Sequence, residues 1–441
     1  MEPDGTKRSW KDLDFSELRR ILPVVRLPAS LPNVPWPPFL AIKSEEEKAW
    51  VAILGTPPYN WRNAKFTESN RAILEHLMEE DAKCQRYNDD CYRKTEEVNA
   101  TLDDKDIYDH VDVWPRSPTP SCFYFWYKSY QMCNTSPTPL RSKRFTQPCE
   151  YDYHATPIIQ FFSLHFAGNF PCGESMSVYG FLAIRDDVDY LRNYVFCRSR
   201  EDAHVIRPDS PDLPLISPVR GMSSSAPVIF EYSIKFVNND KDSSDEDGEI
   251  IDGCFRYVPG NPYHNQQVKP RIYGPLGPVD MQFMYISTGV EATIDVKVKW
   301  AAKGYHLKGV TAFTSRQRNA ILLYDRPASS LVTSKDGSSP WVAVASSVVA
   351  VELGSELKLV VDVSVEGNPA REQHRHEHNK DAKQAVQTHE LSFRAQKYQR
   401  SNCYEREVGI SGQDHVVHCG YLERFNWGAF LIHQPTKRTM N

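Results

Sequence analysis

The chain has 441 residues, of which 40% are hydrophobic, 12% aromatic and 25% charged, and its formal net charge is -5 at pH 7. This length suits about two to three domains, and the slight excess of acidic residues argues against a nucleic-acid-binding protein with a basic surface. The N-terminus has no apolar signal segment and no later run is long enough to cross a bilayer, so we expect a soluble protein of the cytoplasm or nucleus with no membrane partner.

Residues 1–66 are expected to form a proline-rich, partly disordered extension. Six prolines between residues 21 and 40 exclude a regular helix or a central strand and favour an extended, polyproline-like segment. This segment is either a ligand for an aromatic groove or a stiff spacer. Ser44 and Glu47 form a capping box that predicts a short helix ending near Leu54.

Residues 67–102 are predicted to form one amphipathic helix. An apolar row recurs at intervals of seven residues, whereas the companion row is mostly polar, which makes a thin coiled-coil seam. The helix therefore either self-associates through this seam or rests on the main domain. The first row is Leu77, Cys84, Cys91 and Val98, and the second is Leu74, Asp81, Asn88 and Thr95.

Residues 103–157 are expected to be a proline- and aromatic-rich connector. The aromatic block at 123–127 should pack on the main domain, because five adjacent rings in water would promote aggregation. A Ser-Pro-Thr-Pro unit occurs twice, at Ser117–Pro120 and Ser136–Pro139. These units are plausible kinase targets, although proline-rich connectors also produce them by chance.

A dense group of charges follows an apolar run that ends at Ile184. One interpretation is a binding surface that grips a protein partner through bidentate arginine pairs. The other, which we favour, is a set of internal ion pairs that braces the connection between two strands. The candidate binding residues are Arg185, Asp186, Asp187, Arg192, Arg198 and Arg200.

The segment around these charges resembles a domain of unknown function abundant in cereal plants, which also occurs fused behind ribosome-inactivating RNA N-glycosidases. The resemblance is carried by FFSL at 161–164, VYGF at 178–181, AIRD at 183–186, DYLRNYVF at 189–196 and RSR at 198–200. It covers roughly residues 120–433, the last two thirds of the chain. It implies a fold class and a plant stress or defence setting, and it supplies no catalytic residues.

Residues 158–433 are predicted to form one antiparallel β-sandwich, so the protein is mainly β with a partly helical extension. Side chains alternate with period two along about ten runs, which indicates half-buried antiparallel strands. The clearest runs are 228–236, 290–300, 347–352 and 356–365, and the last two are joined by Leu353-Gly354-Ser355 as in a hairpin.

The remaining polar clusters predict no metal or cofactor. The acidic stretch Asn238–Gly253 lacks the carboxylate that a calcium loop needs, and we expect a solvated loop. The histidines 374, 376 and 378 lie in a charged surface stretch. Ligand types near the C-terminus, at Cys403, His415, His418 and Cys419, match no closed zinc pattern.

These patterns favour a non-enzymatic interaction module with an unidentified protein partner. The alternatives are a glycosidic-bond hydrolase related to RNA N-glycosidases, and a carbohydrate-binding domain that uses exposed tryptophans such as Trp300, Trp341 and Trp427. Two carboxylates and an aromatic ring in one pocket would favour the hydrolase. The Glu-Leu-Arg-Arg stretch at residues 17–20 has the spacing of the N-glycosidase pair, but it lies in a charged terminal tail.

Overall fold

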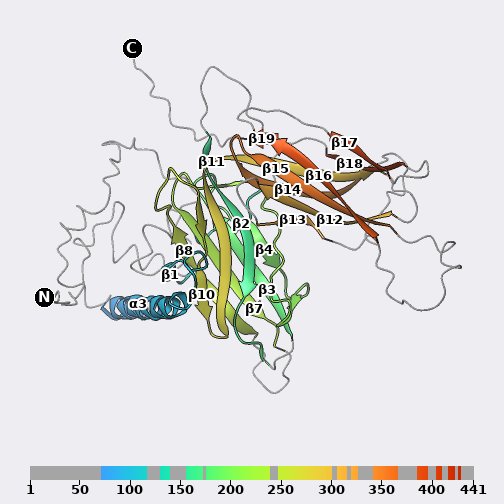
Figure 1. Ribbon diagram of the computed structural model, residues 1–441. Coiled ribbons are helices and arrows are strands. Elements are labelled where there is room, and N and C mark those ends of the chain that lie inside the picture. The colour runs from blue at the N-terminus through green and yellow to red at the C-terminus, as the bar shows by residue number, and fades with distance from the viewer. Residues whose placement is uncertain are drawn as a thin grey trace, which may run out of the picture. The chain divides into compact units, whose positions relative to one another are not determined.

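The computed structural model of the chain describes residues 71–116, 130–139, 155–171, 175–238, 247–299, 305–314, 319–325, 341–365, 385–395, 404–409, 416–422 and 426–428 (Figure 1). The predictions for residues 1–66, for the aromatic block at 123–127 and for the histidines at 374–378 lie outside these ranges. Within them, the secondary structure is one α-helix, α3 (Arg71–Asn99), and antiparallel strands, so the predicted mainly β fold is confirmed.

The strands form three sheets, and each strand pair is antiparallel. The first sheet has the order β1 (Val113–Trp114), β8 (Gly248–Tyr257), β7 (Val228–Phe236), β3 (Met176–Arg185), β4 (Asn193–Arg198), with β5 (His204–Ile206) paired to β3. The second has the order β17 (Tyr404–Gly409), β18 (Val416–Leu422), β11 (Gly277–Lys299), β2 (Thr156–Phe166), β6 (Met222–Ser223). β9 (Gln266–Val268), β10 (Arg271–Gly274), β14 (Trp341–Glu352) and β19 (Asn426–Gly428) also pair with β11. The third has the order β13 (Ile321–Tyr324), β12 (Tyr305–Thr314), β15 (Glu356–Val365), β16 (Ala385–Arg394).

The long strand β11 contributes to two hydrophobic cores. Its first part pairs with β2, β9 and β10, and its side chains, such as Phe283, pack between the first and second sheets. Its second part pairs with β14 and β19, and Val290 and Ile294 pack with Leu357 and Leu359 of the third sheet. The predicted antiparallel sandwich is therefore present, with two cores along one shared strand.

Period-two burial is clear in β15, where Leu357 and Leu359 are buried and Glu356 is exposed. Strand β7 differs from its prediction as a half-buried strand, because its first seven residues are all buried. A segment that we call the strap, residues 130–139, covers its second face. Tyr130 and Met132 of the strap pack there against Ile229 and Cys254.

Helix α3 lies within the stretch 67–102 that is predicted as one helix, and it contacts β1 through positions of the seven-residue rows from Cys84 onward. Asn88 donates to the carbonyl oxygen of Val113 over 2.9 Å and accepts the Val113 N–H over 2.8 Å, in the manner of a neighbouring strand. Cys91 and Thr95 of the same face are buried. Self-association through this seam would therefore require the helix to leave β1.

The acidic stretch predicted as a loop is shorter than expected. Strand β8 already begins at Gly248, and Ile250 and Ile251 are buried in the first core. Asp247, just before the strand, accepts hydrogen bonds from Arg200, from the Tyr179 hydroxyl and from the Asn238 N–H. The loop prediction rested on the high charge of this stretch and was wrong for the two isoleucines. Burial of a strand residue depends on the face to which its side chain points and not on the charge of its neighbours.

Candidate functional site

The predicted charged turn joins two neighbouring strands, since β3 ends at Arg185 and β4 begins at Asn193. Its charged side chains do not share one surface. Arg185 and Asp186 have no exposed area, and Arg192 retains 8%. Arg200 is exposed, whereas Asp187 and Arg198 are half-buried. The candidate residues therefore separate into an interior group and a rim group.

Two arginines of the interior group share one buried carboxylate, that of Glu231 on β7. Arg185 Nε donates to Glu231 Oε2 over 2.7 Å, and Arg192 Nε donates to the same oxygen over 3.0 Å. Arg192 Nη2 donates to the other oxygen, and its guanidinium lies 4.3 Å from the centroid of the Phe181 ring. Glu231 was not predicted as a site residue, because period two places it on the face of β7 that is expected to meet solvent.

Arg185 also fastens two loops to the first sheet. Its Nη1 donates to the carbonyl oxygens of Tyr190, Gln131 and Tyr130 over 2.8, 3.3 and 3.4 Å, and its Nη2 donates to Asn134 O over 2.8 Å. Gln131 and Tyr190 have φ values of 48° and 57°, in the left-handed region that costs a residue with a side chain about 1–2 kcal/mol. One guanidinium therefore binds the carbonyl groups of both strained residues and helps to hold the two turns in place.

Arg220 completes the interior group and was not predicted. It donates to both carboxylate oxygens of Asp186, over 2.6 and 2.7 Å, and to Asp189 over 2.9 Å. Burial acts to lower the pKa of Arg220, but the contact with Asp186 outweighs it and raises that pKa. Burial raises the pKa of Asp186, and Arg220 opposes this shift. No spacing rule links residues 34 positions apart, so the sequence carried no signal for this pair.

The interior group is electrically balanced. It holds three arginines, at 185, 192 and 220, and three carboxylates, at 186, 189 and 231. Buried charges are tolerated when they are paired and hydrogen-bonded, and each of these has a partner of opposite sign. The arrangement supports bracing of the turn, and it leaves these side chains inaccessible to a partner in this state.

The rim group forms separate surface pairs. Arg198 pairs with Asp202 over 2.6 Å, and Arg200 pairs with Asp247 over 2.7 Å. Arg200 and then Tyr179 hold the pKa of Asp247 well below its usual range. Burial and then the bond to Asp247 raise the pKa of Tyr179 to about 12. A binding role for this group stays a prediction, and Arg198 and Arg200 are the arginines that a partner could reach.

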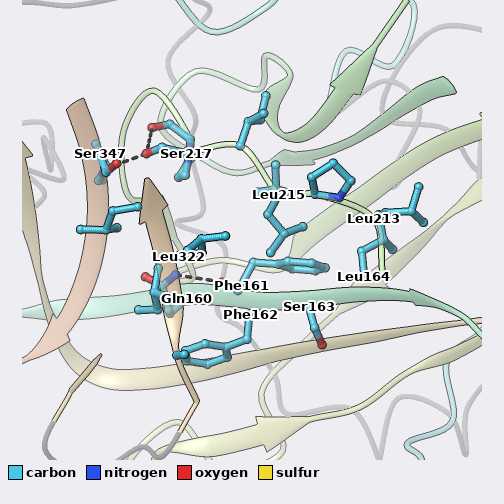
Figure 2. Close-up of a pocket in the computed structure, with 18 of the residues that line it drawn as sticks. Gln160, Phe161, Phe162, Ser163, Leu164, Leu213, Leu215, Ser217, Leu322 and Ser347 are labelled. Atoms are coloured by element: carbon cyan, nitrogen blue, oxygen red, sulfur yellow. Dashed lines mark hydrogen bonds between the residues drawn. The ribbon is translucent and has the colours of Figure 1, made fainter. Parts of the chain in front are cut away.

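A groove of about 400 Å³ lies between β2, residues 212–218 and β13 (Figure 2). On β2 the pairing with β11 shifts register between Gln282 and Phe283, so that Phe162 is an extra, bulged residue. Bulges of this kind re-aim side chains and are frequent beside functional sites. Figure 2 shows Phe161 of this region pointing toward Leu215. The apolar lining includes Phe161, Phe162, Leu164, Leu213, Leu215 and Leu322.

One edge of β2 is open along this groove. β2 pairs with β6 through Ile158 and Ile159, and His165 forms a bridge with Asp212. Among the described residues, positions 160, 161 and 163 between these contacts pair only with β11, on the other side of the strand, and Gln160 Nε2 donates to the carbonyl oxygen of Phe161 over 2.9 Å. An open strand edge beside an apolar groove can accept an extended peptide, whose backbone bonds the edge while its side chains enter the groove.

Two polar side chains of the groove, Gln160 and Ser217, bind β14, and one large apolar side chain is exposed at the groove. Gln160 Oε1 accepts the N–H of Ala350 over 2.8 Å, and Ser217 Oγ accepts the N–H of Val348 over 2.7 Å. Leu322 of β13 is 61% exposed at the groove. The two phenylalanines belong to the FFSL motif at 161–164, whereas Leu322 lies in a short strand with no distinguishing sequence pattern.

A second hollow, of about 440 Å³, lies on the outer face of the third sheet and contains Glu356, Glu390 and Phe313. It therefore combines two carboxylates with an aromatic ring, as a hydrolase would require. Glu356 is exposed, however, and Glu390 pairs with Lys358 over 2.9 Å at the surface. A glycosidase needs one carboxyl group that is buried enough to stay protonated. Neither glutamate of this hollow is buried.

The remaining candidates lie largely outside the described residues. Within the described part, no three His, Cys, Asp or Glu side chains are grouped to hold a metal ion. Cys403, His415 and Trp300 fall outside it, while His418 and Cys419 lie on β18, Trp341 on β14 and Trp427 on β19. In the described part of the chain, no helix is both long enough and apolar enough to span a bilayer.

Comparisons with known proteins identify a family and no function. The model of a domain of unknown function, DUF6598, matches residues 158–399. No curated protein matches. Among solved structures, human GIVD cytosolic phospholipase A2 is similar over 60% of this chain and 32% of its own, with 9% identity and a TM-score of 0.18. This chain thus spans about a third of that protein, and a likeness at this level carries no argument.

Proposed function

The chain belongs to the DUF6598 family of domains of unknown function, and from this premise we propose that it is a non-enzymatic interaction module. Its groove beside β2 would hold an extended, apolar segment of a protein partner. The observation that carries the proposal is the exposed Leu322 beside a stretch of β2 that has a strand partner, β11, on one side only among the described residues. The apolar groove and the exposed leucine beside it together support a contact surface for an apolar ligand.

The groove suits a peptide better than a reaction. Its lining is mainly apolar, and its amide and hydroxyl groups at Gln160 and Ser217 already bind backbone N–H groups of β14. The only carboxylate in the lining is Asp212, whose side chain pairs with His165 over 2.8 Å. We further propose a plant stress or defence setting, on the basis of the family resemblance. We propose a location in the cytoplasm or nucleus, on the basis of the sequence.

Selection from a phage-displayed library of random peptides tests the groove. The full chain should enrich peptides rich in apolar residues, and Leu322→Asp should weaken their binding at least tenfold. Val258→Asp is the matched control, because Val258 is 46% exposed and does not line the groove. Circular dichroism and melting of each variant confirm that folding is retained.

Three outcomes would contradict the proposal. The selection enriches no peptide, or the enriched peptides bind Leu322→Asp as well as the wild type. Alternatively, binding survives Leu322→Asp but is lost when Arg198 and Arg200 are replaced by alanine. The last result would move the binding surface from the groove to the charged rim.

A further inference from the structure

The strap carries the second Ser-Pro-Thr-Pro unit. The two hydroxyl-bearing residues of this unit differ in their exposure to solvent. Thr138 is 3% exposed, its N–H donates to Arg192 O over 2.9 Å and its hydroxyl lies 3.5 Å from Asp189. Ser136 is exposed. The same local sequence motif therefore presents one hydroxyl to solvent and hides the other.

The strap also holds Ser136 in an extended conformation. The Arg192 N–H donates to Ser136 O over 3.2 Å, and Pro137 pairs with Arg192 in a short parallel bridge. The Ser136 N–H donates to the Asn134 side chain over 3.1 Å. A kinase must bring the substrate hydroxyl within reach of its catalytic aspartate, and an exposed side chain on an extended backbone meets this requirement.

The other described Ser-Pro and Thr-Pro positions are buried, lie in a turn or have a hydroxyl that is already bound. The Thr156 hydroxyl is buried. Ser217 Oγ accepts the Val348 N–H over 2.7 Å. Ser210 lies in a tight turn, since Arg207 and Ser210 exchange backbone hydrogen bonds of 3.2 and 3.0 Å. Ser210 and Ser217 are exposed as well, but Ser210 lies in this turn and the Ser217 hydroxyl is bound to β14. Among the described residues, Ser136 is the remaining exposed position that is followed by a proline.

We propose that Ser136 is a phosphate acceptor for a proline-directed serine/threonine kinase. In this step the Ser136 oxygen bonds to the γ-phosphorus of ATP, the bond from that phosphorus to the bridging oxygen of ADP breaks, and the hydroxyl proton passes to the kinase base. The product carries about -1.5 to -2 units of charge at neutral pH. The Thr138 hydroxyl is not an acceptor while the strap is docked.

The test is phosphorylation of the folded full chain by a mitogen-activated protein kinase and ATP, with sites assigned by mass spectrometry. Phosphate on Ser136 should exceed that on Thr138 at least tenfold. Ser136→Ala should abolish the signal of this peptide, and the matched control Ser210→Ala should leave it unchanged. The urea-unfolded chain, diluted into the same reaction, gives the labelling of both residues without the strap.

Phosphate on Ser136 with little on Thr138, in the folded chain alone, supports the proposal. Two results overturn it. Ser136 stays unlabelled in the folded chain, whatever is labelled elsewhere, or Thr138 is labelled as strongly as Ser136 before unfolding. The second result would mean that the strap does not select between the two hydroxyl groups.

Discussion

Arg185 and Glu231 form an ion pair of 2.7 Å whose side chains are 0% and 1% exposed. The two residues come from adjacent strands, β3 and β7, and the same arginine binds the carbonyl groups of the strap. The pair therefore links a sheet to the segment that covers it. This connection explains why the charged turn stands immediately after a buried apolar strand.

Replacing Arg185 with alanine should lower the free energy of unfolding by about 3–5 kcal/mol, because Glu231 and several carbonyl groups lose a buried donor. Arg192→Ala should act in the same direction. Arg198→Ala is the control, since its exposed pair with Asp202 should be worth less than about 0.5 kcal/mol. Urea denaturation followed by tryptophan fluorescence measures each value. Unchanged stability in Arg185→Ala and Arg192→Ala, together with lost capture of the native partner, would make the turn a binding surface instead.

Replacing Asn88 with alanine should lower the free energy of unfolding by about 1–3 kcal/mol, because the buried N–H of Val113 would lose its partner and the C=O of Val113 would keep only the Cys84 thiol. Asp89→Ala, at the next and exposed position of α3, is the control and should have little effect. Thermal unfolding by circular dichroism gives the comparison. Equal melting temperatures for the two variants would show that α3 does not depend on this contact.

Replacing Gly180 with alanine should be far more harmful than the same change at Gly354. Both glycines have positive φ, 117° and 79°, so both substitutions strain the backbone. A Cβ atom at Gly180 would lie 2.0 Å from the carbonyl oxygen of Ser233, whereas at Gly354 it would meet no atom within 4 Å. We expect a loss of about 1 kcal/mol for Gly354→Ala and about 3 kcal/mol or more for Gly180→Ala. Chemical denaturation of both variants decides the order, and a reversed order would refute it.

The contribution of Asp247 should disappear in acid. Its pKa in the folded protein lies below the ordinary value because of Arg200 and Tyr179, so the folded state binds this proton less readily than the unfolded chain. The stability it supplies is present above the unfolded pKa of about 3.9 and is lost as pH falls below it. The melting temperature of Asp247→Asn should therefore lie below that of the wild type at pH 7, and the difference should shrink progressively as pH falls below about 4 toward the still lower folded pKa. Asp209→Asn, in an exposed turn, should show no such convergence; a gap for Asp247→Asn that is constant with pH would rule out this linkage.

The sequence alone locates the helix and the strands whose hydrophobic pattern is contained in a short segment. The seven-residue rows located α3, and period-two alternation located β15 and the general class of antiparallel sandwich. Short segments reveal these elements because hydrophobic periodicity directly reflects which face of a helix or strand is buried. The charged residues that follow the buried strand at Arg185 also favour internal ion pairs over a binding surface.

Only the tertiary structure shows which strands are covered on both faces and which charged residues, distant in the sequence, form pairs. Strap residues such as Met132 bury the second face of β7, and this places Glu231 in the interior although its strand reads as half-buried. Arg220 reaches Asp186 across 34 positions, and the groove forms where β13 comes close to an open stretch of β2. Such contacts depend on strand register and on long-range packing, which leave no periodic trace in the sequence, so neither the complete charge network nor the proposed binding site could be read from the residues alone.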